Sequence, residues 1–276
     1  MSELIWLLIF LAFAVPVVQQ RVLFLRRMTA IRHIEREHGS RVITLIHRQE
    51  ALALLGVPLV RYIDIEDSES VLGAIHLTDD DIPIQLVIHT PGGLVIASTQ
   101  IAQALSHHPA KVQVIVPYLA MSGGSLIALA ADEIVMGPNA VIGPVDPQVS
   151  VPGRTGYPAA SVLDALETPN PNRDDSVLIM GDMARKAREQ MFGIVRALLS
   201  KTMDPEQAEE TARMLSEGRW THDYAIDLEE AREMGLPVTP EFPDEVVRLM
   251  RLYPQAGKRK PGGVEFIPVP YEKKQK

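Results

Sequence analysis

The sequence predicts an α/β fold built on a parallel sheet. Apolar runs of strand length alternate with segments of helical spacing over most of the 276 residues, and such alternation implies parallel strands joined by right-handed crossovers. Two of the strand-to-helix junctions carry a Gly-Gly pair, in HTPGG and in MSGGS. An apolar N-terminal run followed by arginines adds a membrane-anchor helix to the prediction.

The N-terminal run, LIWLLIFLAFAVPVV, occupies residues 4–18 and is followed by Arg21, Arg26 and Arg27. It is shorter than the roughly 20 residues of an ordinary membrane span, although flanking side chains can extend it. A cleaved signal peptide or a buried helix is the alternative, but a signal peptide needs its positive charge before the apolar run. We therefore expect residues 1–20 to form a single-pass anchor, with the body of the protein in the cytoplasm.

Residues 21–39 are rich in Arg and Glu at loosely helical spacing, which predicts a juxtamembrane helix. The folded domain is expected to span residues 40–250. Its first half alternates apolar runs with helical patterns. The predicted strands are residues 42–47, 60–65, 82–89, 112–116 and 134–136. The predicted helices are residues 68–77, with Ser68 as the cap, 94–107 and 125–131.

The composition changes to Pro, Gly and Asn over residues 150–175, which indicates a connecting loop or a flap. Two helices follow, predicted over residues 176–203 and from Pro205 to Gly218. The last residues, 251–276, are rich in Pro, Gly and Lys and end in KKQK, so a flexible tail is expected.

Composition excludes several classes of function. The net charge of −8 argues against nucleic acid as a partner, because phosphate binding needs a basic surface. The chain has no cysteine, which excludes thiol catalysis and thiolate metal sites. Its His, Asp and Glu residues do not cluster at metal-ligand spacing, so neither a metal nor a cofactor is expected.

The two Gly-Gly junctions are the strongest functional signal. Ser122 stands between the apolar run VQVIV and a segment of small residues, which places its hydroxyl at a helix N-terminus. Backbone N–H groups and the helix dipole favour negative charge there. The junction at Gly92 and Gly93 lies one predicted strand earlier. Two such junctions in succession can bring a nucleophile and an oxyanion-binding loop together.

Taken together, HTPGG and AMSGGSLIALAADEIVMGPNAVIGPVDPQ resemble the Clp/crotonase superfamily. Within it the chain is similar to the membrane-bound serine proteases related to signal peptide peptidase A, and most of all to the serine dehydrogenase proteinase family. The later segment SEGRWTHDYAIDLEEAREMGL resembles that family's C-terminal strand–helix element. The resemblance covers roughly residues 40–240.

The resemblance implies repeated β-β-α units around a parallel sheet and a peptidase whose nucleophile is Ser122. It implies an oxyanion hole formed by the backbone amides of Gly92, Gly93 and Gly123. It also implies protein or peptide substrates and a homo-oligomer. A serine hydroxyl needs a base to take its proton, and the tetrahedral oxyanion needs preorganised donors.

The general base is the open question. His222 is the sole histidine after Ser122, and its spacing does not match the Ser-His-Asp order of soluble Clp peptidases. A Ser-Lys dyad is therefore expected, with a lysine whose pKa is lowered by desolvation. Lys186 is preferred and Lys201 remains an alternative, while a surface pair with a neighbouring glutamate would make Lys186 merely structural. Asp146, in GPVDPQ, is interpreted as a turn residue.

The sequence thus predicts a membrane-anchored serine endopeptidase that works through an acyl-enzyme on Ser122, with Lys186 as the base. Two alternatives stay open. One is a crotonase-type enzyme that holds an acyl-CoA thioester in the same oxyanion hole. The other is a membrane scaffold that has kept the fold without catalysis.

Overall fold

The computed structural model describes residues 2–47, 50–51, 58–59, 61–150 and 156–253. It confirms the α/β fold and the parallel sheet. Five strands pair in the order β1-β4-β5-β7-β11, and every pair is parallel. These strands are β1 (Arg41–Ile46), β4 (Ile84–His89), β5 (Val112–Val116), β7 (Glu133–Met136) and β11 (Val238–Thr239).

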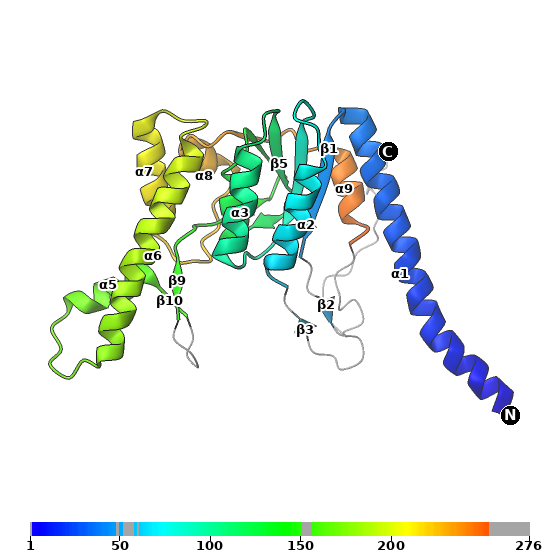
Figure 1. The fold of residues 1–276 in the computed structure, drawn as a ribbon, viewed down its shortest axis with the longest axis horizontal. Helices are drawn as coiled ribbons and strands as arrows, with labels where there is room; N and C mark the ends of the chain where they lie inside the picture. The colour runs from blue at the N-terminus through cyan, green and yellow to red at the C-terminus, as the bar shows by residue number, and fades with distance from the viewer. Residues whose placement is uncertain (1, 48–49, 52–57, 60, 151–155, 254–276) are drawn as a thin grey trace, which may run out of the picture.

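Helices lie on both faces of this sheet (Figure 1). The helices of the described residues are α1 (Ser2–His38), α2 (Ile65–His76), α3 (Val95–Ser106), α4 (Gly123–Ala128), α5 (Ala159–Glu167), α6 (Asp175–Leu199), α7 (Pro205–Ser216), α8 (Leu228–Glu233) and α9 (Asp244–Met250). Three two-stranded pairs complete the described part of the chain: β2 (Glu50–Ala51) with β3 (Pro58–Leu59), β6 (Leu119–Ala120) with β8 (Val141–Ile142), and β9 (Gln148–Val149) with β10 (Tyr157–Pro158).

The central strands are largely apolar because both of their faces are buried. In β4, Leu86 and Ile88 face the larger core, which packs against α3, α4, α6 and α7. Val87, between them, faces a smaller core formed with α1 and α9. Side chains alternate in this way because successive residues of a strand point to opposite faces.

The segment before α2 differs from its prediction. Residues 60–65 were expected to form a strand, but α2 begins at Ile65 and Ile63 makes only an isolated parallel bridge to Gly93. The cap is Asp64 rather than Ser68, because Asp64 forms a reciprocal capping box with Asp67. Ser68 is instead buried inside the helix.

The Pro-rich segment at residues 150–175 is also more ordered than expected, since α5 forms within it. Together α5 and the first half of α6 form an arm that extends from the body (Figure 1). Gly181 of α6 lets α5 pack closely against it, because a Cβ at position 181 would lie 2.0 Å from Leu166 Cδ1 of α5. Residues 151–155, where a flap was also considered, lie outside the described residues.

The N-terminal segment forms one helix rather than two. α1 runs from Ser2 to His38, and its N-terminal end extends away from the body (Figure 1). Among the described residues, no helix combines the length and apolarity that a membrane crossing requires. Most side chains of residues 4–13 lie outside that description, as do residues 254–276 of the predicted tail.

Candidate active site

The candidate site lies where the central strands end, the edge at which parallel α/β sheets usually carry their functional groups. After β4 the chain turns through Gly92 and Gly93, and the segment before α2 crosses this turn. Ile63 donates its N–H to the Gly92 oxygen at 2.8 Å and accepts the Leu94 N–H at 2.8 Å. The crossing requires glycine, since a Cβ on Gly93 would lie 2.2 Å from the Ile63 oxygen.

Ser122 stands at the second Gly-Gly junction in a strained backbone conformation. Its φ is 51° and its ψ is −114°, and it is the one non-glycine residue with positive φ in the described part of the chain. Such strain costs about 1–3 kcal/mol and is typically found at functional sites. Ser122 is the N-cap of α4, yet its hydroxyl makes no capping hydrogen bond. The hydroxyl is therefore available for chemistry.

The neighbouring serine has a structural role. The Ser125 hydroxyl donates to the Ala120 oxygen at 2.7 Å and accepts the Gly143 N–H at 2.9 Å. Ser125 is 1 % exposed. Ser125 thus ties α4 to β6 and to the turn after β8.

The three glycines predicted for the oxyanion hole differ in what their amides do. Gly92 adopts φ +112°, and its N–H is bound to the Thr90 hydroxyl at 3.2 Å. Gly93 and Gly123 line the same cavity as Ser122. Among the hydrogen bonds of the described residues, none uses either of their amides. The two loops are adjacent, because the Gly93 nitrogen lies 3.4 Å from where a Cβ on Gly123 would be.

This cavity has a volume of about 420 Å³ and is lined by both Ser122 and a histidine whose chain spacing did not predict it there. The histidine is His222, and Asp146 lies beside it. His222 Nδ1 is 2.8 Å from Asp146 Oδ1. No hydrogen bond joins Ser122 to His222 within the described residues. Catalytic hydrogen bonds are often long without substrate and shorten in the reacting complex.

Backbone pairing explains how His222 reaches the site from 76 residues beyond Asp146. Ile142 and Ile226 exchange two hydrogen bonds, of 3.0 and 2.9 Å, as an antiparallel bridge. Counting four residues outward from each partner in antiparallel register sets Asp146 opposite His222. The chain spacing that argued against His222 therefore does not keep it from the cavity.

The surroundings of His222 give its ring a defined protonation pattern. A carboxylate can only accept hydrogen bonds, so Nδ1 of the neutral ring carries the proton and Nε2 keeps a free lone pair. The bond to Asp146 raises the pKa of His222 above its ordinary value of 6.5 and outweighs burial, which lowers it. Asp146 is 2 % exposed, and its second oxygen accepts a hydrogen bond from Gln148 at 2.8 Å. Asp146 is thus more than a turn residue.

The structure does not bring either predicted lysine to Ser122. Lys186 has a side chain that is 67 % exposed, and its amino group lies 2.6 Å from Asp182. Lys201 is paired with Asp132 at 2.8 Å. Neither residue lines the cavity. A lysine base must be desolvated to lose its proton, and Lys186 lies in solvent beside a carboxylate.

Sequence reasoning could have kept His222 by a simple count, because it is the sole histidine that follows Ser122. The signal for Asp146 was weaker, since an Asp-Pro pair is typical of turns. Their partnership depends on the bridge between Ile142 and Ile226, for which the sequence carries no pattern.

One cavity is lined by a strained serine at a helix N-terminus, by a His-Asp pair and by two glycines whose amides make no hydrogen bond among the described residues. This arrangement is typical of hydrolases that acylate a serine. The whole chain, residues 1–276, matches the family described as ClpP-like SDH-type serine proteinase, and the protein belongs to this family. It is a serine peptidase.

The relatives extend over the whole chain. Two uncharacterised proteins of Methanocaldococcus jannaschii, MJ1495 and MJ0137, are each 50% identical to it, over 275 and 271 residues. The matches cover 100% and 98% of this chain and 92% and 93% of those proteins.

Two solved structures are also similar to the chain. Both are mutants of the 1510-N membrane-bound stomatin-specific protease. In one, a serine is replaced by alanine. In the other, a lysine is replaced by alanine, and that mutant is in complex with a substrate peptide. Each is 20% identical with a TM-score of 0.46. They cover 68% of this chain, and 79% and 74% of their own chains.

Proposed function

We propose that this peptidase is an endopeptidase that cleaves peptide bonds through an acyl-enzyme on Ser122, with His222 as the general base. Asp146 orients the imidazole, and the amides of Gly93 and Gly123 bind the oxyanion. The observation that carries the proposal is the shared cavity, which contains Ser122 and the His222–Asp146 pair. His222 thus replaces Lys186, the base expected from the sequence.

Each step follows from the groups in the cavity. His222 Nε2 accepts the Ser122 proton while Oγ attacks the carbonyl carbon of the scissile bond. The resulting oxyanion accepts hydrogen bonds from the two amides, neither of which has another partner within the described part of the chain. The imidazolium then gives its proton to the leaving amine, and the acyl-enzyme forms. Water, deprotonated by the same nitrogen, hydrolyses the ester and restores Ser122.

Covalent labelling tests the nucleophile. A fluorophosphonate probe is expected to label the wild type, and labelling and cleavage of fluorescent casein should both be lost in Ser122→Ala. Labelling is read by in-gel fluorescence and by the mass of the modified peptide. Ser70→Ala is the matched control, because Ser70 is an exposed serine of the neighbouring cavity. Full labelling of Ser122→Ala would rule Ser122 out as the nucleophile.

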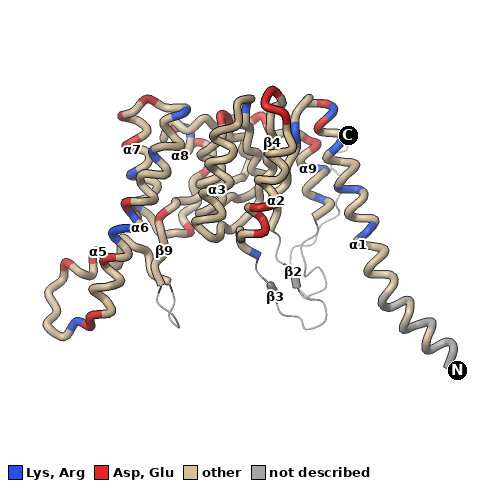
Figure 2. Tube along the Cα trace, viewed as in Figure 1, with Lys and Arg blue, Asp and Glu red and all other residues tan. Residues whose placement is uncertain are grey.

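We also propose that the N-terminal part of α1 anchors the enzyme in a membrane, with the peptidase domain in the cytoplasm. The proposal is supported by the apolar run at residues 4–18 and by exposed apolar side chains on α1, which include Trp6 at 70 % and Phe10 at 66 %. The basic residues that follow on α1 (Figure 2) suit the cytoplasmic interface. Homo-oligomerisation stays a prediction of the family resemblance.

Flotation on a sucrose gradient tests the anchor. The full chain is expected to float with phospholipid vesicles, and the double variant Phe10→Asp, Val15→Asp should stay in the soluble fraction. An aspartate at the centre of a membrane helix costs about 2.5–3.5 kcal/mol. Gln20→Asp, on the same helix beyond the apolar run, is the control and should still float. Equal flotation of the wild type and both variants would contradict the proposal that the N-terminal part of α1 is a membrane anchor.

A further inference from the structure

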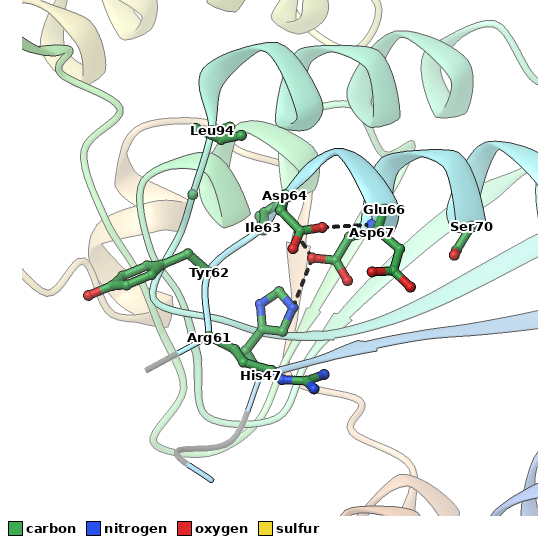
Figure 3. Close-up of a pocket in the computed structure, with 10 residues that line it drawn as sticks. His47, Arg61, Tyr62, Ile63, Asp64, Glu66, Asp67, Ser70 and Leu94 are labelled. Carbon is green, nitrogen blue, oxygen red and sulfur yellow. Dashed lines mark hydrogen bonds and ion pairs between the residues drawn. The ribbon is translucent and has the colours of Figure 1, made fainter. Parts of the chain in front are cut away.

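A second cavity adjoins the catalytic one and shares Tyr62, Gly93 and Leu94 with it. Its volume is about 660 Å³, and acidic residues at the start of α2 line one side of it (Figure 3). His47, which directly follows β1, lies at its base and is 8 % exposed. Nothing in the proposed reaction uses this buried histidine.

His47 is held at both ring nitrogens. Nε2 lies 3.2 Å from Asp67 Oδ2, and Nδ1 lies 2.9 Å from the Thr90 hydroxyl. The same Asp67 oxygen accepts the Asp64 N–H at 3.0 Å, so the capping box of α2 fixes the carboxylate that faces the ring (Figure 3). In the neutral ring with the proton on Nε2, Nε2 donates to the carboxylate and Nδ1 is an acceptor for the Thr90 hydroxyl, whose other acceptor is the Gly92 oxygen at 3.3 Å.

Thr90 connects His47 to the turn that contains Gly92 and Gly93. Thr90 is fully buried, and its hydroxyl oxygen accepts the Gly92 N–H at 3.2 Å. On the other side of the turn, the Leu94 N–H is held by the Ile63 oxygen. Gly93 lies between these two fixed peptides and lines the catalytic cavity, and its own N–H makes no hydrogen bond among the described residues.

We propose that His47 is a positioning residue for the oxyanion hole: it orients the Thr90 hydroxyl, which holds the Gly92 amide and thereby aims the Gly93 N–H at the reacting carbonyl. The inference rests on the proposed function of this cavity. The loss of an oxyanion donor lowers kcat by about 10²- to 10³-fold, and a misplacement of about 1 Å can cost about 10²-fold. Substrate binding in the ground state does not depend on this aim, so kcat should fall while KM stays near its wild-type value.

Two matched pairs of variants test the network with a p-nitrophenyl ester as substrate. Thr90→Val removes the hydroxyl at nearly the same shape, whereas Thr90→Ser keeps it. His47→Asn keeps an amide near the position of Nδ1, facing Thr90, whereas His47→Gln keeps one only near Nε2, facing Asp67. Thr90→Val and His47→Gln should lower kcat by about 10- to 100-fold, and Thr90→Ser and His47→Asn should restore it to within about threefold of wild type.

His108→Gln is the control for the loss of a buried histidine. His108 is 7 % exposed, and its Nε2 lies 2.8 Å from the Ile82 oxygen, outside both cavities. Thermal unfolding shows which variants are folded. If Thr90→Val is not folded, the comparison of His47→Gln with His47→Asn tests the inference. Wild-type kcat in both Thr90→Val and His47→Gln, or a change confined to KM, would overturn the inference. Absence of Ser122-dependent turnover in the wild type would instead overturn the proposed function itself.

Discussion

His222→Gln is expected to lower kcat by roughly 10³- to 10⁶-fold, while Lys186→Gln keeps kcat near the wild-type value. The imidazole of His222 lies in the cavity of Ser122 and holds a buried carboxylate at 2.8 Å. Removal of the general base leaves the hydroxyl protonated during attack, and the oxyanion amides alone supply the remaining catalysis. Lys186 lies on the exposed side of α6 beside Asp182.

The measurement is steady-state hydrolysis of casein and of a p-nitrophenyl ester, with circular dichroism to show that both variants are folded. Lys201→Gln belongs in the same series, since its pairing with Asp132 also places it away from the cavity. Loss of activity in Lys186→Gln together with normal activity in His222→Gln would restore the Ser-Lys dyad that the sequence suggested.

Asp146→Asn should lower kcat by about 10⁴-fold and move the acid limb of the pH profile to lower pH. The amide no longer holds the ring in the tautomer that leaves Nε2 free, which accounts for the loss of rate. Wild-type kcat/KM should rise with pH through the pKa of His222, above 6.5, because only the neutral ring accepts a proton. The hydrogen bond to Asp146 is the main cause of that raised pKa, so its removal lowers the pKa.

The control is Asp223→Asn. Asp223 also raises the pKa of His222, through its charge alone. Its substitution should shift the acid limb slightly to lower pH and leave the plateau near wild type. The profiles are measured as kcat/KM, which reports the pKa values of the free enzyme. An acid limb that stays in place in Asp146→Asn would contradict the role given to this pair.

Local signals in the sequence predicted most of what is local in the fold. The bounds of β5, VQVIV, were predicted as observed, because four of its five residues are apolar and are buried in the centre of the sheet. The Gly-Gly pairs marked the two junctions of the site, since a Cβ would meet the Ile63 backbone at Gly93 and the Ser98 side chain at Gly123. α5 was missed because the Pro-rich composition around AASVLDALE outweighed the helix formers within it.

The base could not be placed in the same way. The contact between His222 and Asp146 depends on a backbone bridge four residues away from each, and strand pairing between distant segments has no periodic signature in one sequence. The expected strand at residues 60–65 failed for a related reason. Ile63 is buried, as its apolar side chain suggested, but its partner is the glycine turn rather than a sheet neighbour.

The backbone strain at Ser122 has a consequence for how this protein can change over time. Glycine would adopt the same φ of 51° with little penalty, so the serine lowers the stability of the fold in return for its hydroxyl. A copy of this gene that no longer needed the reaction would gain stability from the first mutation to glycine at position 122. Selection for a sturdier fold and selection for the reaction therefore act in opposite directions on one side chain.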